Sequence, residues 1–244
     1  MLRSMTRGAL IASMLLLSAC SGATPESPSF AAAPTPSSPA PVATIERTAP
    51  PLCSTAIVGE PDPASVVDAR ANIYAAGRAA PVEPGGFGAG KLPPVWVLPD
   101  GGVRVVTISD VAGCVTPISG STPFHGPGGD GVGPSLVESY AGISGITHQR
   151  NGMFLVGVFV TDAEPRDPAP QTLDFTDAED FDSIEPAIGQ VFFVGDGAGR
   201  RFRAPPDATR LFLGFADAPA YQGPPGAYDN NAGRVQATVT VLVE

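Results

Sequence analysis

Oxygen-bearing side chains gather near the C-terminal end of this chain. Asp217 follows an apolar run, and residues 226–233 read GAYDNNAG, so that Asn230 and Asn231 are neighbours between two glycines. Carboxylates, amide oxygens and main-chain carbonyls are the ligands that Ca²⁺ takes, about six to eight at a time. These residue types predict a calcium site at Asp217, Asn230, Asn231 and a carbonyl of the turn.

The two asparagines can face one ion only if the backbone curls, because successive side chains of a strand point to opposite faces. Gly226 and Gly233 permit such a curl. An ordinary surface turn is the alternative, since turns also select Asp, Asn and Gly. Composition alone leaves both interpretations open.

Segment 202–240 resembles the C-terminal motif of the small bacterial calcium-dependent galactose-binding lectins and of related secreted galactose-binding-like β-sandwich proteins. It reads FRAPPDATRLFLGFAD up to Asp217 and continues to the GAYDNNAG turn. The resemblance implies that Asp217, the carbonyl of Ala227, Asn230 and Asn231 hold the ion, and that the ion bridges the protein to two sugar hydroxyls. A carbonyl from residues 115–117 would complete the shell.

Two departures separate the chain from those lectins. Residues 218–225 lengthen the loop beside the ion. Upstream, segments 126–130 and 152–157 resemble the middle region of the family, but residues 131–134 read GVGP where the lectins place a His and a Gln that hold the sugar. The resemblance to the lectins therefore supports calcium binding by this chain more strongly than it supports galactose specificity.

Four further residues are candidates for contacting a ligand. Tyr228 lies inside the motif, and its ring could stack on a sugar. Asp229 could add charge to the ion if its side chain turns inward. His125 and Asp130 flank the glycine-rich upstream segment and could line the site, although a loop histidine without such a role is the alternative reading.

The elements that must position these residues are short, β-branched and aromatic, and are bounded by Gly, Pro and Asp. This pattern predicts an all-β fold, an antiparallel sandwich of jelly-roll or galactose-binding-like type, whose loops at one end carry function. Strands are expected near residues 66–75, 95–98, 102–110, 136–146, 153–161, 190–194, 209–215 and 234–243. Residues 153–160 are continuously apolar and predict a central strand, whereas 234–243 alternate as a half-buried strand does. Residues 175–188 could hold a short helix.

The N-terminal region indicates export. Residues 1–19 read as a signal peptide ending in LSA before Cys20, which predicts acylation of Cys20; a plain secretory signal is the alternative. Residues 20–50 are rich in Ala, Pro and Ser and predict a disordered tether. The folded domain is expected at 51–244. This order of signal peptide, acylated cysteine, tether and domain predicts an outer-membrane lipoprotein. It would face the periplasm or the surface and be attached to the membrane only through lipid.

Cysteine use and charge set further bounds. In an oxidising compartment Cys53 and Cys114 are expected to form a disulfide, with two separate buried thiols as the alternative. The formal net charge is −10, and residues 200–203 (RRFR) form the longest basic run. Nucleic acid is therefore an improbable partner, and the basic run is expected to lie on the solvent side of a strand.

No catalytic constellation is evident. The acidic residues between 174 and 185 do not follow an EF-hand pattern and are expected to form a solvated loop. His125 and His148, the two histidines, lack a nucleophile context.

The sequence thus predicts a non-enzymatic, lipid-anchored, calcium-dependent carbohydrate-binding protein with a galactose-like glycan as partner and homo-oligomerisation as an option. There are two alternatives. One is an envelope or adhesion module in which calcium is purely structural, and the other is a carbohydrate-active enzyme.

Overall fold

The computed structural model describes residues 65–120 and 123–244. The predicted signal peptide, Cys20, the tether and Cys53 lie outside the described residues. Within the described part of the chain, no helix is long and apolar enough to cross a membrane. Cys114 is disulfide-bonded, and its pairing with Cys53 stays a prediction.

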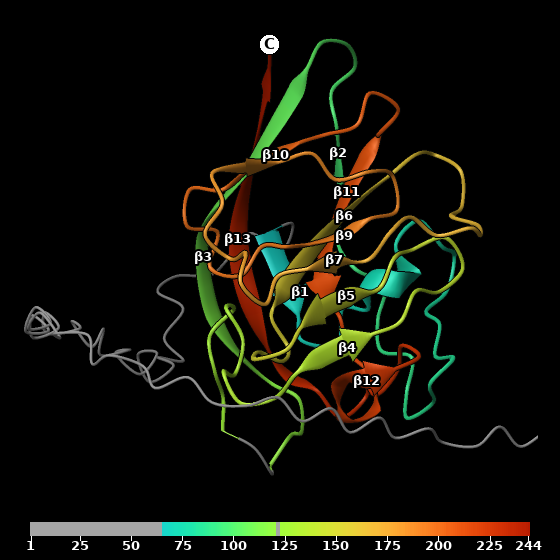
Figure 1. Ribbon diagram of the computed structural model, residues 1–244, viewed down its shortest axis with the longest axis vertical. Helices are drawn as coiled ribbons and strands as arrows, with labels where there is room; N and C mark the ends of the chain where they lie inside the picture. Colours follow the sequence, from blue (N-terminus) through green and yellow to red (C-terminus); the bar gives the residue numbers. More distant parts are fainter. Residues whose placement is uncertain (1–64, 121–122) are drawn as a thin grey trace, which may run out of the picture. The chain divides into compact units, whose positions relative to one another are not determined.

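Three sheets make up the domain (Figure 1). The first contains, in order, β1 (Val66–Asp68), β13 (Ala232–Val243), β3 (Arg104–Thr116), β10 (Arg201–Arg203) and β8 (Ser183–Ile184). The second contains β2 (Val95–Val97), β11 (Arg210–Phe215), β6 (Leu155–Val160) and β9 (Val191–Phe193). The third contains β12 (Gln222–Gly223), β4 (Ser135–Val137), β5 (Ile146–His148) and β7 (Leu173–Asp174).

The first two sheets pack face to face around one apolar core. Phe192 of β9 stacks on Phe202 of β10 with ring centroids 4.6 Å apart, which ties the second sheet to the first. Every residue of β6 is buried between β11 and β9, because an apolar run without alternation has no face suited to water. Most strand pairs are antiparallel, and the predicted all-β, sandwich-type fold is confirmed.

The alternating pattern of β13 is borne out on its core side. Val235 and Ala237 are buried, and Val239 and Val241 are half-buried, while the intervening threonines are exposed. β13 pairs with β3 along nearly its whole length, with a register irregularity between Gln236 and Thr238.

Several predicted strands have different bounds in the structure. The strand expected at 102–110 is the longer β3, which continues to Thr116. Residues 136–146 form two strands, β4 and β5, because Ala141 and Gly142 take positive φ angles of 45° and 89° and turn the chain back. Residues 66–75 form only the short β1, followed by the 3₁₀ helix η2 (Ile73–Ala75), which Asn72 caps by accepting a hydrogen bond from the Tyr74 N–H.

The helix considered at 175–188 is absent; this segment contains the short strand β8. Its acidic side chains are mostly exposed, as expected for a solvated loop. The basic run departs from expectation at Arg200, which is only 7 % exposed and lies over the Phe193 ring at 5.1 Å. The guanidinium donates hydrogen bonds to the carbonyls of Glu179 and Val194, and these bonds compensate for its burial.

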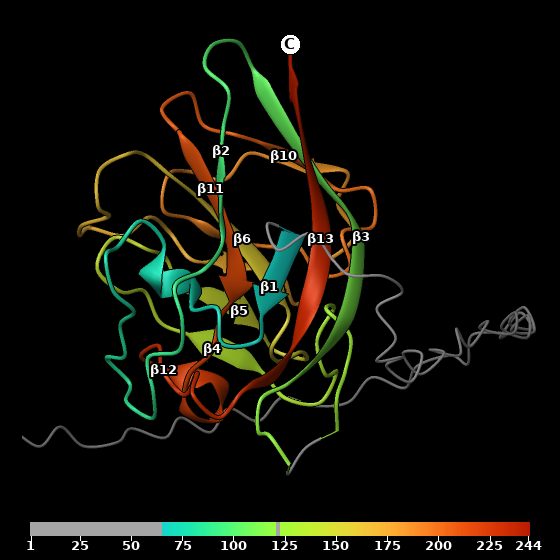
Figure 2. The ribbon, with the colours of Figure 1, turned by 180° about the vertical axis from the view of Figure 1, so that it is seen from behind.

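The loop of interest lies at one end of the β3–β13 ribbon. The chain leaves β11, forms the 3₁₀ helix η3 (Pro219–Tyr221) and β12, and then enters β13. Both views place this loop at the end opposite the C-terminus (Figures 1 and 2). The end of β3 reaches the same place, since Thr116 pairs with Ala232.

Candidate cation site

Asp217 is a buried carboxylate at the point where the chain leaves β11. It is 2 % exposed. Its Oδ1 accepts a hydrogen bond from the Ala218 N–H at 2.8 Å, and its Oδ2 accepts one from Asn231 Nδ2 at 2.9 Å. Burial raises the pKa of Asp217 to about 7, although both hydrogen bonds act in the opposite direction. A carboxylate in this setting lacks a compensating positive charge among its described neighbours.

Asn231 brings a second oxygen to the same place. The residue is 4 % exposed, and its Nδ2 is also shared with the Ala69 carbonyl at 3.2 Å. Its Oδ1 is buried without a hydrogen-bond partner, as is the hydroxyl of Tyr74. An unpaired buried polar atom costs about 1–3 kcal/mol. The amide nitrogen faces the Asp217 carboxylate, so the amide must turn over to bring its unpaired oxygen beside the carboxylate. The two oxygens would then fit the hard oxygen shell of Ca²⁺.

Ala227 and Asn230 lie on the same turn with different exposure. Ala227 is buried, has a φ of 66°, and donates its N–H to the Gly86 carbonyl. Asn230 is exposed, and its carbonyl accepts a hydrogen bond from the Ser119 N–H at 2.8 Å. The structure therefore brings Asp217 and Asn231 into contact and leaves the Asn230 side chain at the surface.

The region predicted to supply a remote carbonyl lies next to this turn. Val115 pairs with Gly233, Thr116 pairs with Ala232, and the Ser119–Asn230 hydrogen bond extends the contact beyond the strands. Residues 115–117 are thus neighbours of the turn that carries the asparagines.

The expectation that Tyr228 stacks on a sugar is wrong. Its ring is 0 % exposed, its hydroxyl donates to the Phe215 carbonyl at 2.9 Å, and the same hydroxyl accepts from the Asp217 N–H at 3.1 Å. Tyr228 instead fixes the backbone that carries the carboxylate. The Asp229 side chain is likewise not turned inward, because its Oδ1 accepts from the Gly90 N–H at 3.1 Å.

Tyr228→Phe should therefore destabilise the domain by about 1–3 kcal/mol, because the Asp217 N–H and the Phe215 carbonyl each lose a buried partner while the ring still fits. Urea unfolding of the wild-type and variant proteins measures this difference. A variant as stable as the wild type would show that this hydroxyl does not hold the loop.

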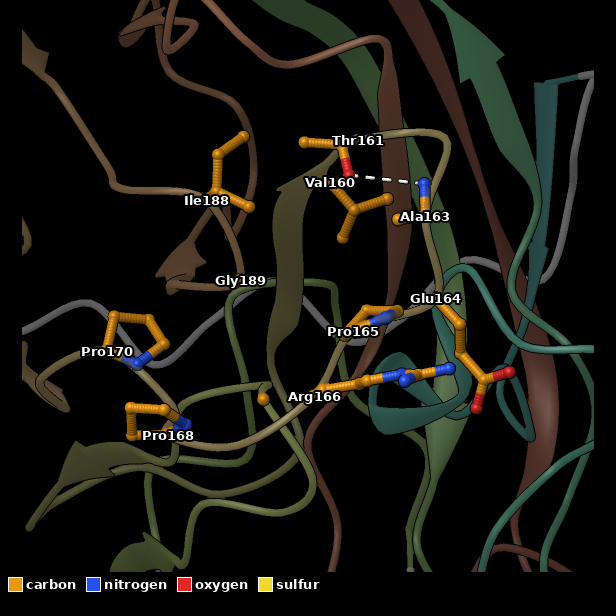
Figure 3. Close-up of a pocket in the computed structure, with 11 residues that line it drawn as sticks. Val160, Thr161, Ala163, Glu164, Pro165, Arg166, Pro168, Pro170, Ile188 and Gly189 are labelled. Carbon is orange, nitrogen blue, oxygen red and sulfur yellow. Dashed lines mark hydrogen bonds between the residues drawn. The ribbon is translucent and has the colours of Figure 1, made fainter.

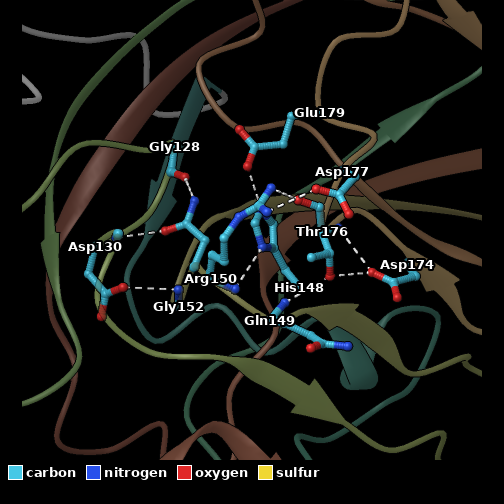
Figure 4. Close-up of polar contacts among 12 residues, drawn as sticks. Gly128, Asp130, His148, Gln149, Arg150, Gly152, Asp174, Thr176, Asp177 and Glu179 are labelled. Atoms are coloured by element: carbon cyan, nitrogen blue, oxygen red, sulfur yellow. Dashed lines mark hydrogen bonds and ion pairs between the residues drawn. The ribbon is translucent and has the colours of Figure 1, made fainter. Parts of the chain in front are cut away.

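Asp130 anchors the glycine-rich segment (Figure 4). Its Oδ1 accepts hydrogen bonds from the N–H groups of Val132 at 2.9 Å and Gly152 at 3.0 Å. The Asn151 amide supports the same segment, with Oδ1 accepting from the Gly131 N–H at 2.8 Å and Nδ2 donating to the Gly128 carbonyl. Asp130 thus uses Oδ1 to hold the loop, while its Oδ2 faces the hydroxyl of Tyr221.

Tyr221 is the neighbouring residue that the sequence did not single out. It belongs to the extra segment 218–225, has a φ of 59°, and its hydroxyl lies 3.5 Å from Asp130 Oδ2. A Cβ built on Gly152 would come within 2.9 Å of its ring, so the glycine leaves room for the tyrosine. The longer loop is therefore packed against the segment that Asp130 holds.

Both histidines make contacts within the fold. His125 pairs with Val115 through a β-bridge, and its Nδ1 lies 2.9 Å from the Gly126 carbonyl. His148 is 1 % exposed, packs on Phe154, and its Nε2 lies 2.5 Å from Glu179 Oε1 (Figure 4). His148 therefore ties the acidic loop to β5.

A pocket of about 230 Å³ lies away from the Asp217 loop (Figure 3). Prolines 165, 168 and 170 and the Arg166 side chain line it, together with the end of β6. None of the predicted site residues belongs to its lining.

Among residues 65–120 and 123–244, no group of three or more His, Cys, Asp or Glu side chains could hold a metal ion. The site predicted at Asp217 is of another kind, since its expected ligands are one carboxylate, amide oxygens and a carbonyl oxygen. No known family model matches the chain, and no curated protein matches it either.

Proposed function

We propose that the protein is a calcium-dependent carbohydrate-binding protein that is exported and attached to the cell envelope through acylated Cys20. The observation that carries this proposal is the buried contact of the Asp217 carboxylate with the Asn231 amide, whose Oδ1 has no partner. Ca²⁺ would satisfy both the carboxylate and the amide oxygen once the Asn231 amide turns over, because its nitrogen faces Asp217 in the absence of the ion.

The proposed ion has a buried side and a solvent side. Asp217, Asn231 and Ala227 are buried, and we propose that they hold the ion from within the loop. Asn230 is exposed on the same turn and would complete the shell from outside. Vicinal sugar hydroxyls would then take the coordination positions that water otherwise fills. Binding is the proposed activity of this site.

A structural role for calcium is the second candidate. It is favoured by the low exposure of Asp217 and Asn231, 2 % and 4 %, and by the GVGP sequence where the resembling lectins hold sugar through His and Gln. In that case the ion stiffens the loop of an adhesion module and contacts no glycan.

Glycan-array binding separates the two candidates. Carbohydrate binding predicts signals that appear with calcium and vanish with a chelator. The variant Asn230→Ala should lower these signals by about tenfold or more, because it removes an amide oxygen from the solvent side of the ion, whereas the melting temperature in the absence of calcium should stay close to that of the wild type. Calcium binding without any glycan signal would leave the structural role.

A further inference from the structure

Within the described part of the chain, the C-terminal half of β13 is an open sheet edge. β1 pairs with β13 only at residues 234–236, whereas β3 pairs with it as far as Val243. Among the described strands, β3 is thus the only one beside residues 238–243. Figure 1 shows this half of β13 running with β3 to the C-terminus. Such an edge is a template for another strand.

The hydrogen bonds at the C-terminal end of β13 determine which of its residues face the open edge. Val103 and Glu244 exchange both backbone hydrogen bonds, with distances of 3.1 and 2.8 Å. In an antiparallel ladder, bonded and non-bonded pairs alternate. Val239, Val241 and Val243 therefore direct their N–H and C=O groups away from β3, toward the open edge.

This edge lacks the features that usually block strand addition. Residues 235–243 read VQATVTVLV, without a proline or a charged side chain, in a chain of net charge −10. Leu242 and Val243 are 54 % and 52 % exposed. By contrast β2, the edge of the second sheet, has only three residues and is flanked by Pro94 and Pro99. Prolines and short edge strands protect against pairing.

We infer that β13 of one molecule pairs antiparallel with β13 of a second copy of this chain, with a two-fold axis at Val241. Val241 then pairs with Val241 of the second copy, and Val239 pairs with Val243. All three outward-directed residues of each copy are bonded, giving about six hydrogen bonds across the axis. A second copy is the favoured occupant because two acidic chains repel each other least at an uncharged edge, and because the strand is complementary to itself in this register.

Sedimentation equilibrium of the full chain with Cys20→Ser, which keeps acyl chains out of the measurement, tests this inference from micromolar to sub-millimolar concentration. We expect a dimer for this protein. Val241→Pro removes the N–H at the axis, and Thr240→Lys places two cations across the axis within reach of each other, so each should weaken dimerisation by about tenfold or more. Thr240→Ser is the matched control and should dimerise normally.

Circular dichroism and thermal melts establish that each variant is folded. If Val241→Pro is not, Thr240→Lys decides, because its side chain lies on the exposed face. Amide exchange adds a residue-level readout, since the N–H groups of Val239, Val241 and Val243 should be protected more strongly at high protein concentration. A protein that stays monomeric throughout the range overturns the inference, and so does a dimer that both variants leave intact.

Discussion

Asp217→Asn should abolish the heat of calcium binding, with a loss of affinity of at least about 100-fold, or roughly 3 kcal/mol. Among the described residues, Asp217 is the one carboxylate that contacts Asn231, and calcium affinity depends strongly on the charge of its ligands. Asparagine has nearly the same shape, so the Ala218 N–H keeps an acceptor. Isothermal titration calorimetry measures the loss directly.

Asp229→Asn is the matched control for this substitution. It removes the same charge from the same loop, but its carboxylate is exposed and bonded to the Gly90 N–H. We expect Asp229→Asn to bind calcium with nearly the heat of the wild type. Equal heats for the wild type and Asp217→Asn would refute the site.

In the absence of calcium, the stability of the protein should fall as the pH rises from about 4 to 7. The pKa of Asp217 is raised from 3.8 to about 7 by burial, so the folded state holds a proton that the unfolded state releases. The stabilisation by this proton is fully present below about pH 4 and is lost as the pH passes through the folded pKa. Three pKa units set an upper bound of roughly 4 kcal/mol.

Saturating calcium should remove this loss, because the bound ion would stabilise the ionised carboxylate. Thermal melts from pH 4 to 8, with calcium and with chelator, measure both slopes. Asp217→Asn should flatten the calcium-free slope, since its side chain does not titrate. Calcium-free slopes that are the same for wild type and variant would contradict a raised pKa at Asp217.

The parts of the fold that follow from local pattern were predictable. The unbroken apolar run at 153–160 became the central strand β6, and the alternating residues 234–243 became β13. The strand expected at 136–146 was divided because Gly142 and Ala141 reverse the chain, a turn that a mean hydrophobic pattern does not reveal. The same limit applies to 66–75, where the cap at Asn72 starts η2.

The candidate site was predictable in its residue types and less so in its surroundings. The motif predicted that Asp217 and Asn231 lie together, and Asn231 Nδ2 donates to Asp217 Oδ2 at 2.9 Å. That they share an ion stays a prediction. The contact of the Ala69 carbonyl with Asn231 depends on how the chain after β1 packs against the loop, so no spacing in the sequence indicates it. The burial of Tyr228 was missed for the same reason: its position in the motif does not reveal which surface covers its ring.

Anomalous diffraction from crystals grown with calcium tests the central claim most directly. We predict a single anomalous peak at about 2.3–2.6 Å from an Asp217 carboxylate oxygen and from Asn231 Oδ1. A map without a peak there, in which Asp217 Oδ2 still accepts from the Asn231 amide nitrogen, would contradict the account.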